Sequence, residues 1–80
     1  MTKGEKTNQM IVENILTDLK AKGLIIVWRK SDKLNSVYEV FSQKKNFSVH
    51  SSWEEGSFTV CNKFVRGNSN LRKKIEGILK

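Results

Sequence analysis

The apolar residues of this chain change their spacing twice, which restricts the folds that the chain can adopt. Near the N-terminus they recur at helical spacing and fall on one face, as Ile11, Val12, Ile15, Leu16 and Leu19. Near the C-terminus a second helical stripe consists of Leu71, Ile75, Ile78 and Leu79. Between the stripes, apolar and polar residues alternate, which is typical of strands with one buried face. The pattern therefore predicts a helix at each end and strands between them.

The first helix is predicted over about residues 8–22. Thr7 or Asn8 can cap its start, because short polar side chains accept hydrogen bonds from the free N–H groups of the first turn. Gly23 follows it as a left-handed residue, and Leu24 can pack back against the last turn. This combination indicates a Schellman stop.

Four strands are predicted, over residues 24–30, 37–43, 47–53 and 57–65. The first is apolar on both faces at its start, as in the interior of a sheet. Short turns join the strands, including a polar turn over 31–36, and short turns favour antiparallel pairing. The second helix is predicted after 66–70, where Ser69 or Asn70 can cap it.

This order predicts an α+β fold, a two-layer sandwich with an antiparallel four-stranded meander and both helices on one face. Eighty residues form one domain, expected over 7–80 after a flexible tail at 1–6. The second sheet face is too polar for a core, and carries Ser48, His50, Ser52, Thr59, Cys61 and Lys63. We expect that face to meet solvent, a partner subunit or a ligand.

The charge of the chain favours a polyanionic partner. Fifteen Lys and Arg residues oppose eight Asp and Glu residues, which gives a net charge of +7. Residues 63–80 are the most basic part, with six positive side chains and one negative. Clustered cations release counterions when they bind phosphates, so this segment predicts a nucleic-acid interface.

The predicted phosphate-binding residues of this segment are Lys63, Arg66, Asn68, Arg72, Lys73 and Lys74. Outlying contacts are predicted at the ends of the first two strands, by Arg29, Lys30, Lys44 and Lys45. The alternation places Phe47, Phe58 and Phe64 in the core. Trp28 and Tyr38 are the candidates for exposed rings that stack on bases.

His50 and Cys61 are the only histidine and the only cysteine. One of each cannot complete a closed zinc shell, so no metal or cofactor is expected. His50 on a polar strand face leaves open a small ribonuclease with this residue as general base. Paired catalytic carboxylates and phosphate-binding glycine loops are missing from the sequence, and we expect no enzyme activity.

The sequence thus predicts a non-catalytic protein that binds RNA or DNA through the phosphate backbone. The alternative is a small phage-type or mobile-element protein that inhibits an acidic host protein or a nucleoprotein complex. A lone cysteine, no apparent leader and no long apolar run predict a cytoplasmic protein that does not bind membranes. The core of so short a chain is small, which leaves a homodimer open.

Overall fold

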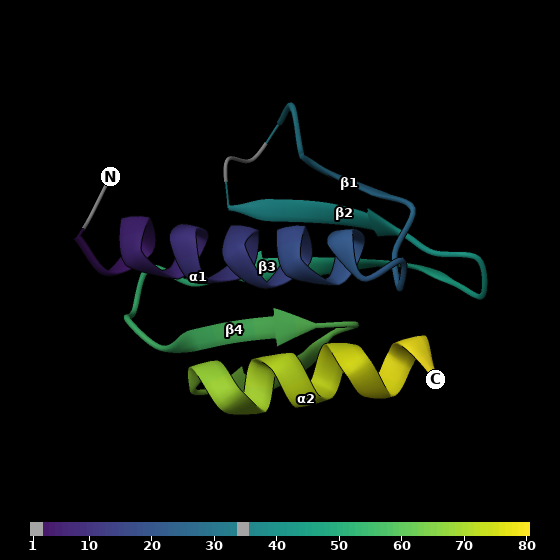
Figure 1. Ribbon diagram of the computed structural model, residues 1–80. Coiled ribbons are helices and arrows are strands. Elements are labelled where there is room, and N and C mark those ends of the chain that lie inside the picture. The colour runs from purple at the N-terminus through teal and green to yellow at the C-terminus, as the bar shows by residue number, and fades with distance from the viewer. Residues whose placement is uncertain (1–2, 34–35) are drawn as a thin grey trace.

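The computed structural model describes residues 3–33 and 36–80. Within these ranges the chain forms α1 (Lys3–Ala21), β1 (Val27–Lys30), β2 (Val37–Phe41), β3 (Asn46–Ser51), β4 (Ser57–Val60), β5 (Lys63–Arg66) and α2 (Asn68–Leu79). The strands form one sheet in the order β1-β2-β3-β4-β5, and every neighbouring pair is antiparallel. Figure 1 shows α1 and α2 on one side of this sheet, roughly along the direction of the strands. The α+β class predicted from the sequence is confirmed.

The prediction of four strands was wrong, because residues 57–65 form a hairpin and not one strand. Cys61 and Asn62 have φ angles of 51° and 67°, the left-handed pair that a two-residue hairpin turn requires. Val60 pairs with Lys63 across this turn. The turn uses no glycine, so the usual sequence signal for it was missing.

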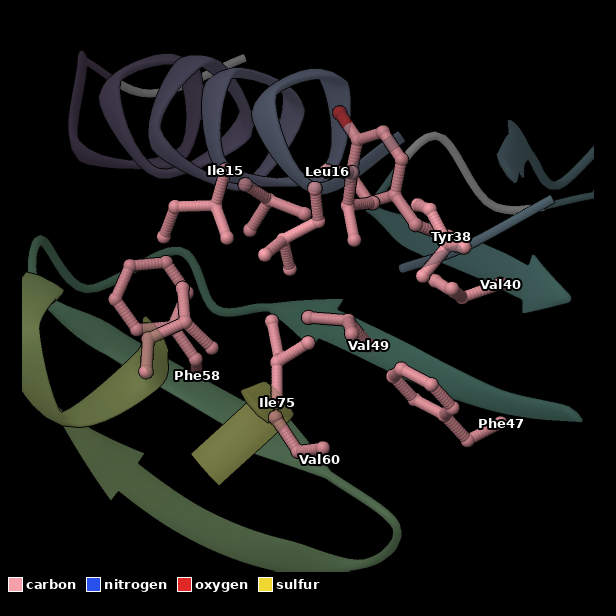
Figure 2. Packing of buried hydrophobic residues seen from close by; sticks show 13 residues of the cluster. Ile15, Leu16, Tyr38, Val40, Phe47, Val49, Phe58, Val60 and Ile75 are labelled. Carbon is pink, nitrogen blue, oxygen red and sulfur yellow. The ribbon is translucent and has the colours of Figure 1, made fainter. Parts of the chain in front are cut away.

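The core lies between the two helices and one face of the sheet (Figure 2). Its sheet side consists of alternate strand residues, namely Tyr38, Val40, Phe47, Val49, Phe58 and Val60. Its helix side consists of Val12, Ile15, Leu16 and Leu19 from α1, with Leu71 and Ile75 from α2. The predicted core positions of Phe47 and Phe58 are confirmed. Burial of the two helical stripes stabilises the fold, because it removes apolar surface from water.

The end of α1 follows the prediction. Gly23 has a φ of 79°, and its N–H donates to the carbonyl of Lys20 at 3.0 Å. The N–H of Leu24 donates to the carbonyl of Leu19, also at 3.0 Å. These two bonds define a Schellman motif, which turns the chain toward β1.

The start of α1 differs from the prediction. The helix already includes Lys3, so the tail expected over 1–6 is helical from that residue on, while Met1 and Thr2 lie outside the described residues. Gly4 allows this early start, because a Cβ there would lie 2.7 Å from the backbone oxygen of Trp53. The N-terminal turn of α1 thus lies directly against the loop between β3 and β4.

Asn8 is buried inside α1 and does not cap it. Its side-chain N–H groups donate to the carbonyls of Ser52 and Glu54, each at 2.7 Å. Its side-chain oxygen accepts from the N–H of Gly56 at 2.8 Å. A polar residue that looked like a helix cap in the sequence therefore binds a loop more than forty residues later in the chain.

The first predicted strand was also misplaced in the sheet. β1 begins only at Val27 and is an edge strand, not an interior one. Leu24, Ile26 and Val27 are consequently exposed, with Ile26 at 57%. Positions 34 and 35 of the turn predicted over 31–36 lie outside the described residues.

Candidate nucleic-acid interface

An open groove runs along the β5 edge of the sheet, beside α2. Its lining residues are Phe64, Val65, Arg66, Asn70, Lys73 and Lys74, and we call it the β5–α2 groove. β5 is the last strand of the sheet, so its outer side has no neighbouring strand. Three of the predicted phosphate-binding residues, Arg66, Lys73 and Lys74, meet in this groove.

The turn at Gly67 creates the groove by sending the chain back along β5. Gly67 has a φ of 95°, and its N–H donates to the carbonyl of Gly56 at 2.8 Å. Gly67 is the N-cap of α2, and its carbonyl accepts from the N–H of Leu71, so the caps predicted at 69 and 70 were wrong. The side chain of Asn70 instead donates to the carbonyl of Arg66 at 2.8 Å, which links the helix to the strand.

Burial on one side of α2 exposes lysines on the other. Leu71 and Ile75 point into the core, so Asn70, Lys73 and Lys74, which share a face at helical spacing, line the groove. Among the side chains that the structure describes, no carboxylate forms an ion pair with either lysine. Both ammonium groups are therefore available to an anionic ligand.

Arg66 is the third cation of the groove and has two neighbours. Its guanidinium lies 2.9 Å from a carboxylate oxygen of Glu54 and 5.9 Å from the centre of the Phe64 ring. Both members of the ion pair are exposed, so solvent screens their attraction. A phosphate can compete for this guanidinium more easily than for one in a buried pair.

Arg72 does not line the groove, although Lys73 and Lys74, which follow it in the sequence, do. Its guanidinium binds Asp18 of α1 at 2.9 Å, and Lys22 binds the same carboxylate at 3.1 Å. Hydrogen bonds from Arg72 and then Lys22 hold the pKa of Asp18 below its usual value. The ion pair of Arg72 with Asp18 thus joins the two helices, and the carboxylate largely offsets the charge of Arg72.

The other predicted contacts are dispersed. Arg29 and Lys30 lie on β1, at the opposite edge of the sheet, where Glu39 and Glu13 pair with them at 3.1 and 3.4 Å. Lys44 donates to the carbonyl of Lys80. Three more predicted contacts are exposed but are not part of the groove lining, namely Lys45, Lys63 and Asn68.

The aromatic residues predicted to stack on bases are not free to do so. Tyr38 is fully buried, and its hydroxyl donates to a carboxylate oxygen of Glu13 at 2.6 Å. Burial, with this carboxylate beside it, raises the pKa of Tyr38. Trp28 is half-buried, with its ring centre 5.8 Å from that of Tyr38. Both rings belong to the packing between α1 and the sheet.

Phe64, which the alternation predicted to lie in the core, is exposed, so this prediction was wrong. The hairpin turn at Cys61 and Asn62 shifts the alternation, so that Phe64 pairs with Thr59 and faces away from the helices. It is 65% exposed. Recognising the turn was the one way to find this residue from the sequence.

His50 lies on the same open face of the sheet, in register with Thr59. It is exposed, and within the described ranges no hydrogen bond or ion pair joins it to a second ionisable group. Across the same ranges, no three His, Cys, Asp or Glu side chains gather as metal ligands. Neither helix of these ranges has the length and apolar character needed to cross a bilayer.

Comparison of the chain with protein families, with curated proteins and with solved structures finds no match. The site must therefore be interpreted from its own geometry and charge.

Proposed function

We propose that this protein binds RNA or DNA through the β5–α2 groove and catalyses no reaction on it. The observation that carries the proposal is the pair of lysines, Lys73 and Lys74, that no described carboxylate neutralises. They lie beside Arg66 in an open groove, on a chain with a net charge of +7. A phosphate backbone is the common biological polymer that suits such a surface.

The mechanism is electrostatic. Lys73 and Lys74 contact phosphate oxygens, and each contact releases part of the counterion atmosphere of the polymer. Arg66 exchanges its exposed carboxylate partner, Glu54, for a phosphate. The long-range field of the remaining surface lysines raises the rate of encounter.

A salt series measured by fluorescence anisotropy tests the proposal. Binding of labelled RNA or DNA should weaken steeply between about 50 and 200 mM salt, with a log–log slope of roughly −0.7 to −0.9 per phosphate neutralised. Affinity that is independent of salt, or no binding at the lowest salt, contradicts it.

A second candidate function is binding to an acidic protein, as a phage-type inhibitor of a host protein or nucleoprotein complex would do. The exposed apolar residues Leu24, Ile26 and Val27 favour it, because they lie together at the start of edge strand β1. Purification from lysate with and without nuclease separates the two functions. A stoichiometric protein partner that survives nuclease treatment supports the second, and loss of all partners supports the first. Either function fits our proposal of a cytoplasmic protein with a single cysteine.

A further inference from the structure

We infer that the β5–α2 groove takes single-stranded rather than duplex nucleic acid, with one base stacked on the ring of Phe64. This inference rests on the proposed function and names its ligand. It starts from the exposure of Phe64, because a large apolar side chain that is 65% exposed takes little part in the core.

The position of the ring suits a base. Phe64 points to the face of the sheet that the core does not use, where its neighbours in register are Thr59 and His50. One face of an exposed ring is thus open to a flat partner. An aromatic ring stacks on any of the four bases, because every base has a π-face.

Arg66 extends this platform along the same strand. It is two residues after Phe64 and on the same side of β5, and its guanidinium lies 5.9 Å from the ring centre. A guanidinium in this place can contact the phosphate next to the stacked base or the plane of a second base. The ring and the cation therefore bind one nucleotide together.

The groove also supplies the second contact that a single strand requires. Lys73 and Lys74 lie on α2, whereas the ring of Phe64 projects from β5, and both line the same groove. A strand that follows the edge of the sheet can place its phosphates on the helix and turn a base toward the ring. In a duplex each base is already stacked and paired, so Phe64 has no free base to contact.

The test compares oligo-dT, oligo-U and a blunt-ended duplex of similar length by fluorescence anisotropy at one salt concentration. The protein should bind the single strands about tenfold or more tightly than the duplex. Phe64→Leu should weaken single-strand binding by about tenfold and leave the salt slope and duplex binding unchanged. Phe64→Trp should restore single-strand binding, because it retains a stacking surface.

Met10→Ala is the matched control, because Met10 is 60% exposed on α1, on the other side of the sheet from Phe64. It should bind like the unaltered protein, and circular dichroism should show that every variant is folded. Equal binding of duplex and single strand, or unchanged binding by Phe64→Leu, overturns the stacking inference. If the stacking inference is overturned but Lys73→Gln with Lys74→Gln still weakens nucleic-acid binding, the proposed function remains supported without the stacking of a base on Phe64. No binding to any nucleic acid overturns both.

Discussion

The two helices cover the same face of the sheet and both bury an apolar stripe, but α1 adds several polar contacts to its stripe, whereas α2 depends mainly on its apolar contacts. In α1, Asn8 binds the loop between β3 and β4, Glu13 binds Tyr38 and Lys30, and Asp18 binds Arg72. In α2, burial of Leu71 and Ile75 fixes the helix, and Arg72 is its one side chain with a described ion pair. Figure 1 shows both helices on the same side of the strands, with β4 visible between them.

The difference in polar contacts between α1 and α2 indicates which cations are available to a ligand. Glu13 and Asp18 of α1 offset the charges of Lys30 and Arg72, although each cation is distant in the sequence from its carboxylate partner. The first turn of α2 has no acidic residue, and no ion pair of the described side chains involves Lys73 or Lys74. The number of cations in a segment therefore overstates its binding surface, because tertiary pairing decides which of them remain.

The largest expected effect is on the polar attachment of α1. Asn8→Ala should lower the free energy of unfolding by about 2–3 kcal/mol, because it removes three hydrogen bonds of a buried side chain and leaves partly buried backbone groups of the loop without these partners. Chemical denaturation measures this loss. Asn14→Ala, an exposed position on the same helix, is the control and should change stability far less. A loss no larger than that of the control would show that water replaces these hydrogen bonds.

The second effect separates binding from stability. Lys73→Gln with Lys74→Gln should weaken nucleic-acid binding by about tenfold or more and reduce the salt slope by roughly one to two. Stability should change by less than about 0.5 kcal/mol, because both side chains lack a described partner. Arg29→Gln with Lys30→Gln is the matched pair at the other edge of the sheet. If it weakens binding as much as the α2 pair does, the groove is not the main contact.

The third effect tests the contact between α1 and β2 (Figure 2). Tyr38→Phe should cost about 1 kcal/mol, because it removes the hydroxyl that donates to Glu13 and keeps the ring in the core. Thermal or urea unfolding measures the change. The same substitution in a Glu13→Ala background should cost less, and equal costs in both backgrounds would contradict the coupling.

The fourth effect compares a glycine in each helix. Gly77→Ala in α2 should stabilise the protein by about 0.5–1 kcal/mol, because a Cβ there meets nothing within 4 Å and alanine favours the helix. Gly4→Ala in α1 should destabilise it, because the Cβ would lie 2.7 Å from the backbone oxygen of Trp53. Opposite shifts in the unfolding midpoint are expected, and shifts of the same sign would argue against the close contact at Gly4.

The smallest effect is the pH dependence of the bond between the helices. The pKa of Asp18 is lowered from 3.8 in the folded protein, so its contribution is complete well above that value and is lost as the pH falls through the folded pKa. Asp18→Asn should therefore be slightly less stable than the parent at neutral pH, and the difference should vanish in acid. Urea midpoints across the acid range measure it, with Asp32→Asn as a control that has no described ion pair. A difference that persists below the folded pKa would contradict the role of the ion pair.

The regular parts of the fold could be predicted because local residues specify them. The C-terminal end of the first helix was predicted from the apolar stripe that ends at Leu19 and from the glycine at position 23. The hydrogen bonds of the Schellman motif confirm it. The alternation around Phe47 and Phe58 identified the buried sheet face. Only local backbone geometry and side-chain period were needed for these predictions.

The candidate site was predicted less well, because it depends on one turn and on distant partners. The turn at Cys61 and Asn62 contains no glycine, and missing it put Phe64 in the core. Tyr38 became a stacking candidate for another reason, because the pattern of its own strand allowed either face. The carboxylates that pair with Arg72 and Lys30 come from α1. Their approach follows from packing, which no local pattern reveals.

The sequence by itself determined the helices and the core alternation, because each depends on residues that are neighbours in the chain. It also determined the excess of positive charge, because the net charge is a sum over the composition. The tertiary structure alone decided which cations stay unpaired and that the ring of Phe64 faces solvent. Both outcomes depend on how strands reverse and on which side chains meet after the apolar surfaces are buried. The groove beside Lys73 and Lys74, with Phe64 at its edge, is a product of that packing.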